Sequence, residues 1–282
     1  MLPIKIPVLS GISDYLETFP FINKLCLCNY LVARPTGRIT VEDVLSVSVI
    51  IPCRNERGNI EAAVNRIPHM GKHTEIIFVD GHSEDGTPEE IRRVIAAHPD
   101  KDIKFFVQDK TGKGDAVRKG FTKASGDILM ILDADLTVAP EDLPKFYDAV
   151  ASQKGELING CRLVYPLEQQ AMRLLNMLGN KFFSMAFTWL LNQRIKDTLC
   201  GTKVLSRENY FHIMENRSFF GEFDPFGDFD LLFGASKMNL KILEVPIRYH
   251  ARAYGETQIS RFRHGWLLLK MTFFAFKKFK VI

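Results

Sequence analysis

Short hydrophobic runs recur along the chain from about residue 45, separated by polar stretches that carry apolar residues at helical spacing. A continuous apolar run bounded by polar residues predicts a strand that is buried on both faces. Strands are expected at residues 47–51, 75–79, 103–107, 128–132, 157–162 and 242–245. Helices are expected near residues 59–67, 87–98, 114–123 and 172–191, with others starting near 140 and ending near 237. Such alternation predicts an α/β fold whose central, mostly parallel sheet is flanked by helices.

The helix expected at 87–98 has several start signals at once. Thr87 is placed as its N-cap, Pro88 falls in the first turn and Glu90 follows three residues after Thr87. A threonine with an acidic residue three positions later is a capping-box pattern. The sequence therefore predicts that Thr87 caps this helix, which would begin at the next residue.

Polar residues follow the ends of three expected strands. Residues 52–56 follow the first strand, Asp80 follows the second, and Asp133 and Asp135 follow the run at 128–132. In open parallel sheets, ligands collect beyond the carboxyl ends of the strands. We therefore expect these residues to lie together at one edge of the sheet and to form a binding site.

Asp133 and Asp135 stand one residue apart at the end of a buried strand. If strand geometry persists, its period of two points both carboxylates the same way. Adjacent carboxylates repel each other unless a cation lies with them, and their oxygen atoms suit Mg²⁺ or Mn²⁺ carrying a phosphorylated substrate. The pair predicts a metal and diphosphate site, with two solvated loop charges as the alternative.

Four motifs in a fixed order carry a family resemblance. They are residues 48–56 (SVIIPCRNE), 78–87 (FVDGHSEDGT), 113–116 (KGDA) and 133–135 (DAD). This set resembles family 2 glycosyltransferases of the GT-A fold over roughly residues 46 to 265. The resemblance implies an inverting, metal-dependent enzyme that uses a nucleotide-activated sugar.

The same resemblance implies roles for residues on the donor side. The residues implied to line the nucleoside pocket are Pro52, Arg54, Glu56 and Asp80, and the diphosphate and metal are assigned to Lys113, Asp133 and Asp135. Many family members have two acids where this chain has Asp80-Gly81, so the nucleotide base is not predicted. Lys113 lacks the spacing of a P-loop; it lies at a helix start, where anions bind favourably, and a solvated surface lysine is the alternative.

The helix expected at 172–191 indicates what kind of acceptor the enzyme would use. Four polar residues fall three and four positions apart and would form one stripe on this largely apolar helix: Arg173, Asn176, Asn180 and Lys181. A plain core helix with one exposed strip would show the same pattern. The helix and a preceding strand arginine resemble polyprenyl-phosphate sugar synthases, typified by dolichol-phosphate mannose synthase. That resemblance implies acceptor-phosphate contacts from Arg162, Arg173, Asn176 and Asn180, and guanidinium groups suit phosphate.

Later motifs supply candidate catalytic residues. Asp228 or Asp230 would act as general base if the acceptor were a hydroxyl group, whereas a phosphate acceptor is already an oxyanion and needs no base. Cys200, in the turn 197–203, is interpreted as a packing residue. Residues 247–258, here called the closing segment, resemble the family segment that folds over the diphosphate, with His250 and Arg252 as candidates. The subfamily commonly has lysine at the position of Gln258.

The two ends of the chain are expected to lie outside the transferase domain, which is placed at residues 46–260. Residues 1–45 form an N-terminal extension that distantly resembles the end of a class I methyltransferase domain, with a packing arm as the alternative. Residues 261–282 combine dense apolar residues with six basic ones, which suits an amphipathic helix on anionic lipid, a dimerisation or core helix being the alternative. No window is long and apolar enough for a membrane span.

Composition narrows the location and the partners. The net charge of +4 does not argue for nucleic acid, and five cysteines without paired spacing fit a reducing compartment. We predict a cytoplasmic enzyme at the inner face of a membrane, moving a sugar from a nucleotide sugar to a polyprenyl phosphate with Mg²⁺ or Mn²⁺. Transfer to a saccharide or other hydroxyl acceptor and a non-catalytic nucleotide- or membrane-binding module are the alternatives. The sugar, the base and the oligomeric state are not predicted.

Overall fold

The computed structural model describes residue 33 and residues 44–163, 174–217, 227–252, 254–255 and 261–281. For some of these, including Asn176 and Asp228, only the backbone is described. The predicted N-terminal extension lies almost entirely outside these ranges, and so do Arg173 and Gln258. Predictions for those residues stay predictions.

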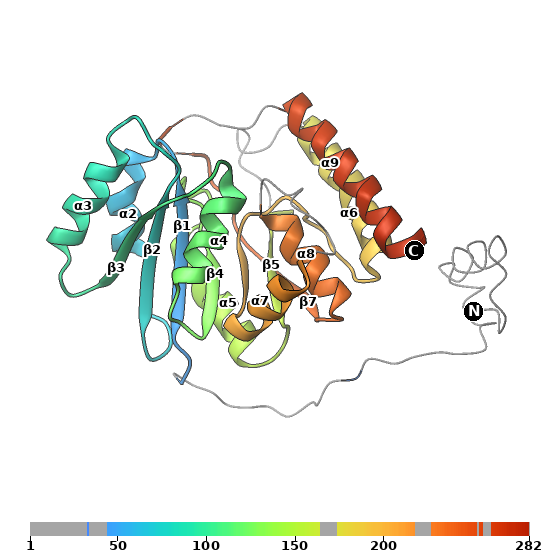
Figure 1. Ribbon diagram of the computed structural model, residues 1–282, viewed down its shortest axis with the longest axis horizontal. Coiled ribbons are helices and arrows are strands. Elements are labelled where there is room, and N and C mark those ends of the chain that lie inside the picture. The colour runs from blue at the N-terminus through green and yellow to red at the C-terminus, as the bar shows by residue number, and fades with distance from the viewer. Residues whose placement is uncertain are drawn as a thin grey trace.

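Within the described residues, a seven-stranded sheet has the order β3-β2-β1-β4-β6-β5-β7. The strands are β1 (Val47–Cys53), β2 (Thr74–Asp80), β3 (Asp102–Val107), β4 (Ile128–Ile131), β5 (Leu157–Cys161), β6 (Lys203–Ser206) and β7 (Ile242–Pro246). Neighbouring strands are parallel from β3 to β4 and between β5 and β7, whereas β6 runs antiparallel to β4 and β5. The expected mostly parallel sheet is confirmed (Figure 1).

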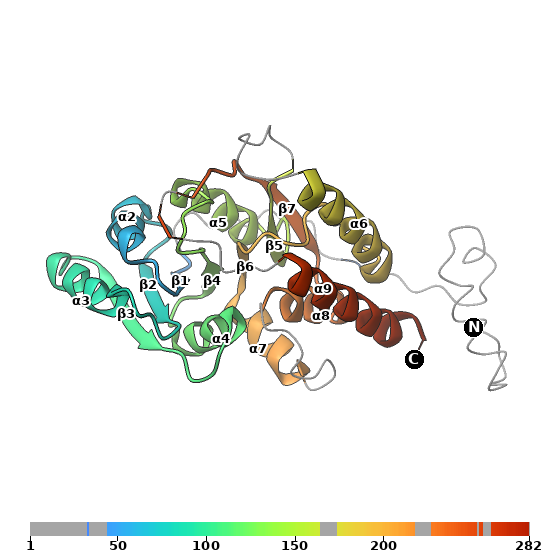
Figure 2. The ribbon, with the colours of Figure 1, turned by 90° about the horizontal axis from the view of Figure 1, so that it is seen from above.

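Helices cover both faces of the sheet. They are α2 (Ile60–Arg66), α3 (Thr87–Ala97), α4 (Lys113–Lys123), α5 (Leu143–Ala151), α6 (Leu174–Leu191), α7 (Arg207–Glu215), α8 (Asp228–Lys237) and α9 (Arg261–Phe276), with short turns η2 (Arg57–Asn59), η3 (Pro140–Asp142) and η5 (Lys277–Val281). Figure 2 shows α4, α7 and α8 on one side of the sheet and α2 and α5 on the other, with α6 and α9 side by side beyond β5.

The period of two in each strand divides its side chains between two cores. In β1, Ile50 packs in the core under α4, α7 and α8, whereas Val49 and Ile51 pack in the core under α2, α3 and α5. All three side chains are fully buried, and each such burial stabilises the fold by about 1.5–3 kcal/mol. The uninterrupted apolar runs of the sequence are the direct result of this two-sided burial.

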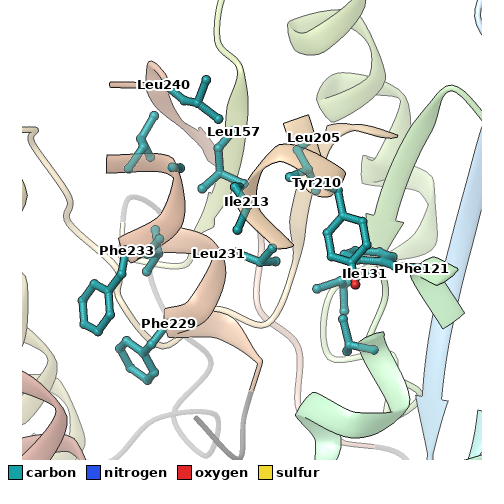
Figure 3. Packing of buried hydrophobic residues seen from close by; sticks show 14 of the residues in the cluster. Phe121, Ile131, Leu157, Leu205, Tyr210, Ile213, Phe229, Leu231, Phe233 and Leu240 are labelled. Atoms are coloured by element: carbon teal, nitrogen blue, oxygen red, sulfur yellow. The ribbon is translucent and has the colours of Figure 1, made fainter. Parts of the chain in front are cut away.

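The first of these cores lies between one face of the sheet and the helices α4, α7 and α8 (Figure 3). Phe121 of α4 meets Tyr210 of α7 edge to face with ring centroids 4.8 Å apart. Phe229 and Phe233, one turn apart on α8, both contact Phe187 of α6. This aromatic packing fixes α6 and α8 relative to the strands that lead into the polar edge.

One predicted helix start is wrong by one residue. Gly86, with φ of 85°, is the N-cap of α3, and Thr87 is the first residue of the helix. The Thr87 hydroxyl instead accepts a hydrogen bond from the backbone N–H of Glu56, 3.0 Å away. The threonine therefore joins the loop after β1 to the start of α3 and does not cap the helix.

The sequence analysis assigned no element to β6 or α7. Strand β6 has only four residues and begins with Lys203, which is fully buried. Helix α7 begins after Ser206, whose hydroxyl accepts a hydrogen bond from the backbone N–H of Asn209 at 3.1 Å. Within the described residues, none of the helices combines the length and hydropathy needed to cross a bilayer.

Gly120 of α4 is expected to be intolerant of any side chain. A Cβ atom there would lie 2.5 Å from Cγ2 of the buried Ile50. We predict that Gly120→Ala lowers the free energy of unfolding by about 1–3 kcal/mol in urea titrations because it overpacks the helix–sheet contact.

Gly179 of α6 supplies the control, because a Cβ atom there meets nothing within 4 Å. Gly179→Ala is expected to raise the free energy of unfolding by up to about 1 kcal/mol through helix propensity. Equal effects of the two substitutions would contradict the proposed overpacking.

Candidate functional site

The ends of β1, β2 and β3 form the first part of the polar edge. Asp80 ends β2 and is buried; its Oδ2 accepts from the backbone N–H of Ser83 at 3.1 Å, whereas its Oδ1 has no hydrogen-bond partner among the described residues. A Cβ atom on Gly81 would lie 3.3 Å from Cβ of Arg54 and 3.5 Å from Oε1 of Gln108. Asp80 thus keeps one buried acceptor atom, and Gly81 leaves space between two polar side chains.

Glu56, in the loop after β1, is buried and paired. Its carboxylate accepts from Nδ2 of Asn59 and from Nη1 of Arg252, each at 2.7 Å. Burial raises the pKa of Glu56, and the guanidinium of Arg252 opposes that increase. Pro52 is half-buried in β1 and Arg54 is exposed at the same edge. The predicted nucleoside-pocket residues therefore lie on neighbouring strand ends.

Asp133 lies beyond β4 and forms an ion pair with Lys113, the first residue of α4. The distance from Lys113 Nζ to Asp133 Oδ1 is 2.6 Å. Burial raises the pKa of Asp133, but Lys113, with smaller contributions from Lys203 and Arg162, outweighs burial and holds the pKa below its usual value. Asp133 is therefore ionised in the folded protein.

Asp135 has different partners, because strand geometry does not persist. Strand β4 ends at Ile131, and Leu136 has a left-handed φ of 52°. The Oδ2 atom of Asp135 accepts from Nη2 of Arg252 at 2.7 Å, and its Oδ1 atom accepts from the hydroxyl and the backbone N–H of Thr137 at 2.8 and 3.1 Å. The two acids of the motif thus bind two cations from separate parts of the chain.

The turn 197–203 packs directly against the first of these ion pairs. A Cβ atom on Gly201 would lie 2.1 Å from Oδ2 of Asp133 and 2.4 Å from Nζ of Lys113. Only glycine leaves both groups in place. Lys203, at the end of the turn, is fully buried and donates to the backbone carbonyl of Cys200 at 2.6 Å.

The closing segment crosses this edge from β7 towards β1. Tyr249 forms an antiparallel bridge with Val138, and the backbone N–H of His250 donates to the carbonyl of Thr137 at 2.9 Å. The Tyr254 ring lies on Gly58, where a Cβ atom would approach Cδ2 of the ring to 2.5 Å. The segment therefore brings Arg252 between Glu56 and Asp135, while the His250 side chain is exposed.

Arg162, which follows β5, is buried and binds Asp197. Its Nε and Nη2 atoms donate to the two carboxylate oxygens of Asp197, each at 2.7 Å, and Asn180 Nδ2 donates to the same carboxylate at 3.0 Å. Burial opposes both charges, but mutual attraction lowers the pKa of Asp197 and raises that of Arg162. The predicted acceptor residues Arg162 and Asn180 thus converge on one carboxylate.

The predicted polar stripe of α6 faces inward from Asn180 onward. Asn180 is buried, whereas Lys181 is exposed, so the two do not share an exposed strip. The inward face continues with Ser184 and Thr188, whose hydroxyls donate to the carbonyl of Ile195 at 2.7 and 3.1 Å. Asn176 lies in α6, but its side chain is outside the described part of the structure.

The candidate general base Asp230 lies in a separate ion-pair group. Its Oδ2 atom is 3.0 Å from Nε of Arg217 and 3.4 Å from Nη1 of Arg118. Burial raises the pKa of Asp230 in spite of both arginines. Asp228 is the first residue of α8, and its side chain is not described.

Cys200 has the properties of a packing residue. It is buried, and burial raises the pKa of its thiol to about 12. A Cβ atom on Gly160 would lie 2.6 Å from its sulfur, so the thiol fills the space that this strand glycine leaves. A thiol that stays protonated is a poor nucleophile.

Three residues of the edge were not predicted as site residues from the sequence: Gln108, Asp197 and Lys203. Gln108 follows β3, is buried and donates its backbone N–H to the carbonyl of Asp80 at 2.9 Å. The strand-end rule that selected Asp80 would have selected it too. Asp197 and Lys203 belong to the turn 197–203; the partner of Asp197, Arg162, lies 35 residues away in the sequence, whereas Lys203 binds the carbonyl of Cys200 within the turn.

The metal chemistry of the edge depends on Asp133 and Asp135. No group of three His, Cys, Asp or Glu side chains close enough to hold a metal ion occurs among the residues that the structure describes. The two aspartates offer hard oxygen ligands, and each already has a cationic group at 2.6–2.7 Å. These donors fit Mg²⁺ or Mn²⁺ only if a bound ligand supplies further oxygens.

The sequence is similar to those of known proteins. The sequence model for "Glycosyl transferase family 2" matches residues 48–216. A dolichol-phosphate mannosyltransferase of Pyrococcus furiosus is 31% identical over 237 residues, which cover 80% of this chain and 64% of that protein, less than two thirds of its length. A dolichyl-phosphate hexose transferase of Haloferax volcanii is 30% identical over 224 residues, covering 78% of this chain and 89% of that protein.

Solved structures share the fold. Glucosyl-3-phosphoglycerate synthase from Mycobacterium tuberculosis, in complex with Mn²⁺, uridine diphosphate and phosphoglyceric acid, superposes with a TM-score of 0.61. The match is 18% identical in sequence and covers 84% of this chain and 80% of that one. The expected GT-A arrangement of a mostly parallel sheet with flanking helices is thereby confirmed.

The ion pair of Arg162 and Asp197 predicts a specific pH dependence of stability. We expect Asp197→Asn to lower the free energy of unfolding at pH 7 by about 3–5 kcal/mol, because it leaves Arg162 buried without its partner. The folded pKa of Asp197 is below its unfolded value of about 3.9. Its stabilisation is therefore complete at neutral pH and is lost as the pH falls from about 5 towards the folded pKa.

Urea unfolding between pH 7 and pH 3 measures this effect. The stability difference between wild type and Asp197→Asn should narrow by roughly 1 kcal/mol by pH 3. A difference that stays constant over this range would show that Asp197 has an ordinary pKa in the folded state.

Proposed function

The chain belongs to glycosyl transferase family 2, and from this premise we propose that it transfers a sugar, with inversion, from a nucleotide sugar to a polyprenyl phosphate. One observation carries the proposal: the turn 197–203 contacts the Asp133–Lys113 pair through Gly201 and the Arg162 guanidinium through Asp197, so both lie at the same edge of the sheet. A diphosphate donor and a phosphate acceptor need cationic and metal-binding groups in that proximity.

On the donor side, the unpaired Oδ1 of Asp80 would accept a hydrogen bond from the nucleoside, with Pro52, Arg54, Glu56 and Gln108 around it. Lys113 and Arg252 would exchange part of their contact with Asp133 and Asp135 for oxygens of the diphosphate. A flexible ammonium and a guanidinium are suited to that exchange because both bind phosphate. The sugar would then lie beyond Asp133, towards Arg162.

Asp133 and Asp135 would hold a divalent cation, Mg²⁺ or Mn²⁺, together with diphosphate oxygens. Such an ion neutralises the charge that builds up on the leaving diphosphate as the anomeric bond breaks. The Thr137 hydroxyl, which donates to Asp135 at 2.8 Å, fixes the orientation of that carboxylate. The Mycobacterium tuberculosis structure is named as a complex with Mn²⁺, which supports the assignment.

On the acceptor side, Arg162, with Arg173 and Asn176, would contact the lipid phosphate, whereas the buried Asn180, whose amide donates to Asp197 at 3.0 Å, would support Arg162 indirectly. Arg162 uses its Nε edge for Asp197, so its Nη1 edge is the one left to bind an anion. A phosphate oxygen is ionised at neutral pH and attacks the anomeric carbon without a base.

The alternative acceptor, a hydroxyl compound, would need Asp228 or Asp230 as base. The contacts of Asp230 with Arg118 and Arg217 favour a structural role for that residue and support the phosphate acceptor.

The surface of α6 and α9 supports peripheral binding to an anionic membrane. Its large apolar residues recur with the same spacing on both helices, at Phe182, Met185 and Trp189 and at Trp266, Leu269 and Phe273, and are 37–66% exposed. Lysines lie over several of these rings, as Lys277 does over Phe273 at 5.0 Å and Lys280 over Trp189 at 5.3 Å. The sequences of α6 and α9 contain no Asp or Glu. Apolar residues with a basic rim favour the headgroup zone of anionic lipid.

Figure 1 shows that α6 and α9 both begin near the polar edge of the sheet. A membrane that contacts this surface would therefore present a lipid phosphate close to Arg162. We accordingly assign residues 46–260 to the transferase domain and 261–282 to the membrane-binding helix, on the cytoplasmic face.

Transfer to a lipid phosphate is the first test of the proposal. Wild-type protein with nucleotide sugars, Mn²⁺ and polyprenyl phosphate in detergent should form a lipid-linked sugar, and Asp135→Asn should lower kcat/KM by about 100-fold or more through loss of metal and diphosphate contacts. Arg173→Ala should lower lipid transfer by about 10- to 100-fold, whereas Asp228→Asn should leave it within about twofold.

The reverse pattern, with hydroxyl acceptors used and Asp228→Asn inactive, would establish the alternative acceptor. Nucleotide-sugar binding that is independent of Mn²⁺, with no transfer to any acceptor, would support a non-catalytic module. A thermal-shift assay with and without Mn²⁺ measures that binding, because a ligand of the folded state raises the melting temperature.

Membrane binding is tested with lipid vesicles. We expect wild-type protein to co-sediment with vesicles that contain anionic phospholipid, more weakly as salt increases. Phe273→Asp should weaken binding by about tenfold or more, because an aromatic side chain that would insert into the headgroup zone is replaced by a negative charge. Phe211→Asp changes an exposed aromatic residue on α7, outside this surface, and should have no such effect. Equal losses for both variants would argue against this surface.

A further inference from the structure

We propose that Asp197, assisted by Asn180, is the positioning residue that directs the Arg162 guanidinium at the acceptor phosphate. The inference rests on the proposed function and deepens it. It assigns a positioning role to a side chain that the acceptor would not contact. Three sets of contacts carry it: those of the carboxylate with Arg162, those that hold Asp197, and those that confine the guanidinium plane.

The carboxylate fixes one edge of the guanidinium. Nε and Nη2 of Arg162 donate to Oδ2 and Oδ1 of Asp197 at 2.7 Å each, and the backbone N–H of Arg162 donates to Oδ2 at 3.1 Å. This side-by-side pairing sets the rotation of the planar group. The Nη1 side of the fork is then directed away from Asp197, with two N–H groups that can meet a second anion in the same plane.

Asp197 cannot follow a movement of the arginine, because its own backbone is held on both sides. Its N–H donates to Oε1 of Glu244 at 3.0 Å, and its carbonyl accepts from Nδ2 of Asn159 at 2.7 Å. Its Oδ1 also accepts from the backbone N–H of Leu199 at 3.1 Å and from Asn180 at 3.0 Å. Asp197 is fully buried, so the contacts that orient Arg162 are made before any acceptor arrives.

The remaining freedom of the guanidinium is limited by Tyr249 of the closing segment. The Arg162 guanidinium carbon lies 5.1 Å from the centroid of the Tyr249 ring, a cation–π distance. The arginine is itself 9% exposed. With its edge bound by Asp197 and its face covered by Tyr249, Arg162 has one direction left in which to bind a ligand.

The same contacts argue against Asp197 as a general base. Both of its carboxylate oxygens are engaged by donors, and its attraction to Arg162 lowers its pKa. A general base needs a free oxygen near the proton that it removes and a pKa close to the working pH. Asp197 therefore acts through Arg162 and not on the substrate.

The test is a double-mutant cycle on the full chain, with sugar transfer to a prenyl phosphate in detergent as the assay. Asp197→Asn should raise the KM for the prenyl phosphate by about 10- to 100-fold, the size of a lost charge-assisted contact, and leave the KM for the nucleotide sugar within about twofold. In an Arg162→Gln background, Asp197→Asn should have almost no further effect on the acceptor KM, because a positioning residue has nothing left to position.

Two further variants keep the result interpretable. Asn180→Ala preserves the ion pair and should raise the acceptor KM by a few fold, so it replaces Asp197→Asn if that variant does not fold. Thr188→Val removes both hydrogen bonds between the Thr188 hydroxyl and the backbone of Ile195, just before the turn 197–203, without touching Asp197. It should lower the melting temperature and leave the acceptor KM unchanged, which separates positioning from general loosening of the turn.

Other outcomes overturn the inference. A loss of kcat in Asp197→Asn with unchanged acceptor KM, together with loss of the acidic limb of the pH–rate profile, would identify Asp197 as a base. Additive effects of Asp197→Asn and Arg162→Gln would show that the two residues act independently. Absence of any transfer by wild-type protein to a prenyl phosphate would instead reject the proposed function, a result that differs from both.

Discussion

Neutralisation of carboxylates at the carboxyl edge of the sheet is the constraint on which this structure depends. Four acids there have a cation within 2.7 Å: Asp133 has Lys113, Asp135 and Glu56 share Arg252, and Asp197 has Arg162. A fully buried charge without a partner costs far more than one contact returns, so the pair of Asp197 and Arg162 cannot lose a member cheaply, whereas the partly exposed Asp133 and Asp135 can exchange partners. The cations come from the start of α4, from the closing segment and from the end of β5. Charge pairing therefore brings distant parts of the chain to one site.

The sequence was sufficient for the parts of the fold whose signal is local. Strands such as β1 are buried on both faces, and that burial requires the uninterrupted apolar run from Val47 to Ile51. Strand β6 was missed because it is short and starts with Lys203, a charged residue that is buried against the carbonyl of Cys200 and close to the carboxylate of Asp133. The start of α3 was misplaced because the hydroxyl of Thr87 binds Glu56, a partner that no local pattern reveals.

The candidate site divides in the same way. Asp80, Asp133 and Asp135 could be selected because strand ends in a parallel sheet share an edge, and the family resemblance added Arg162 and Arg252. The sequence could not predict which side chains of the site bind each other. Asn180 was predicted for a lipid phosphate, yet in the structure its amide binds the carboxylate of Asp197. The spacing along α6 predicted one polar stripe, but Asn180 is buried and Lys181 is exposed, because packing against the carbonyl of Ile195 turns Asn180, Ser184 and Thr188 inward.

The bridge that Arg252 makes between Glu56 and Asp135 has a consequence for the charge balance of the site. The single guanidinium lies between two carboxylates and neutralises only one of their two negative charges, so the bridge leaves room for further positive charge at this point. A divalent ion held by Asp135 would compete with that guanidinium for the carboxylate, and a diphosphate would offer the arginine another anion to bind. Arg252 is therefore placed to link the loop after β1, the Asp133 motif and the closing segment through one movable charge.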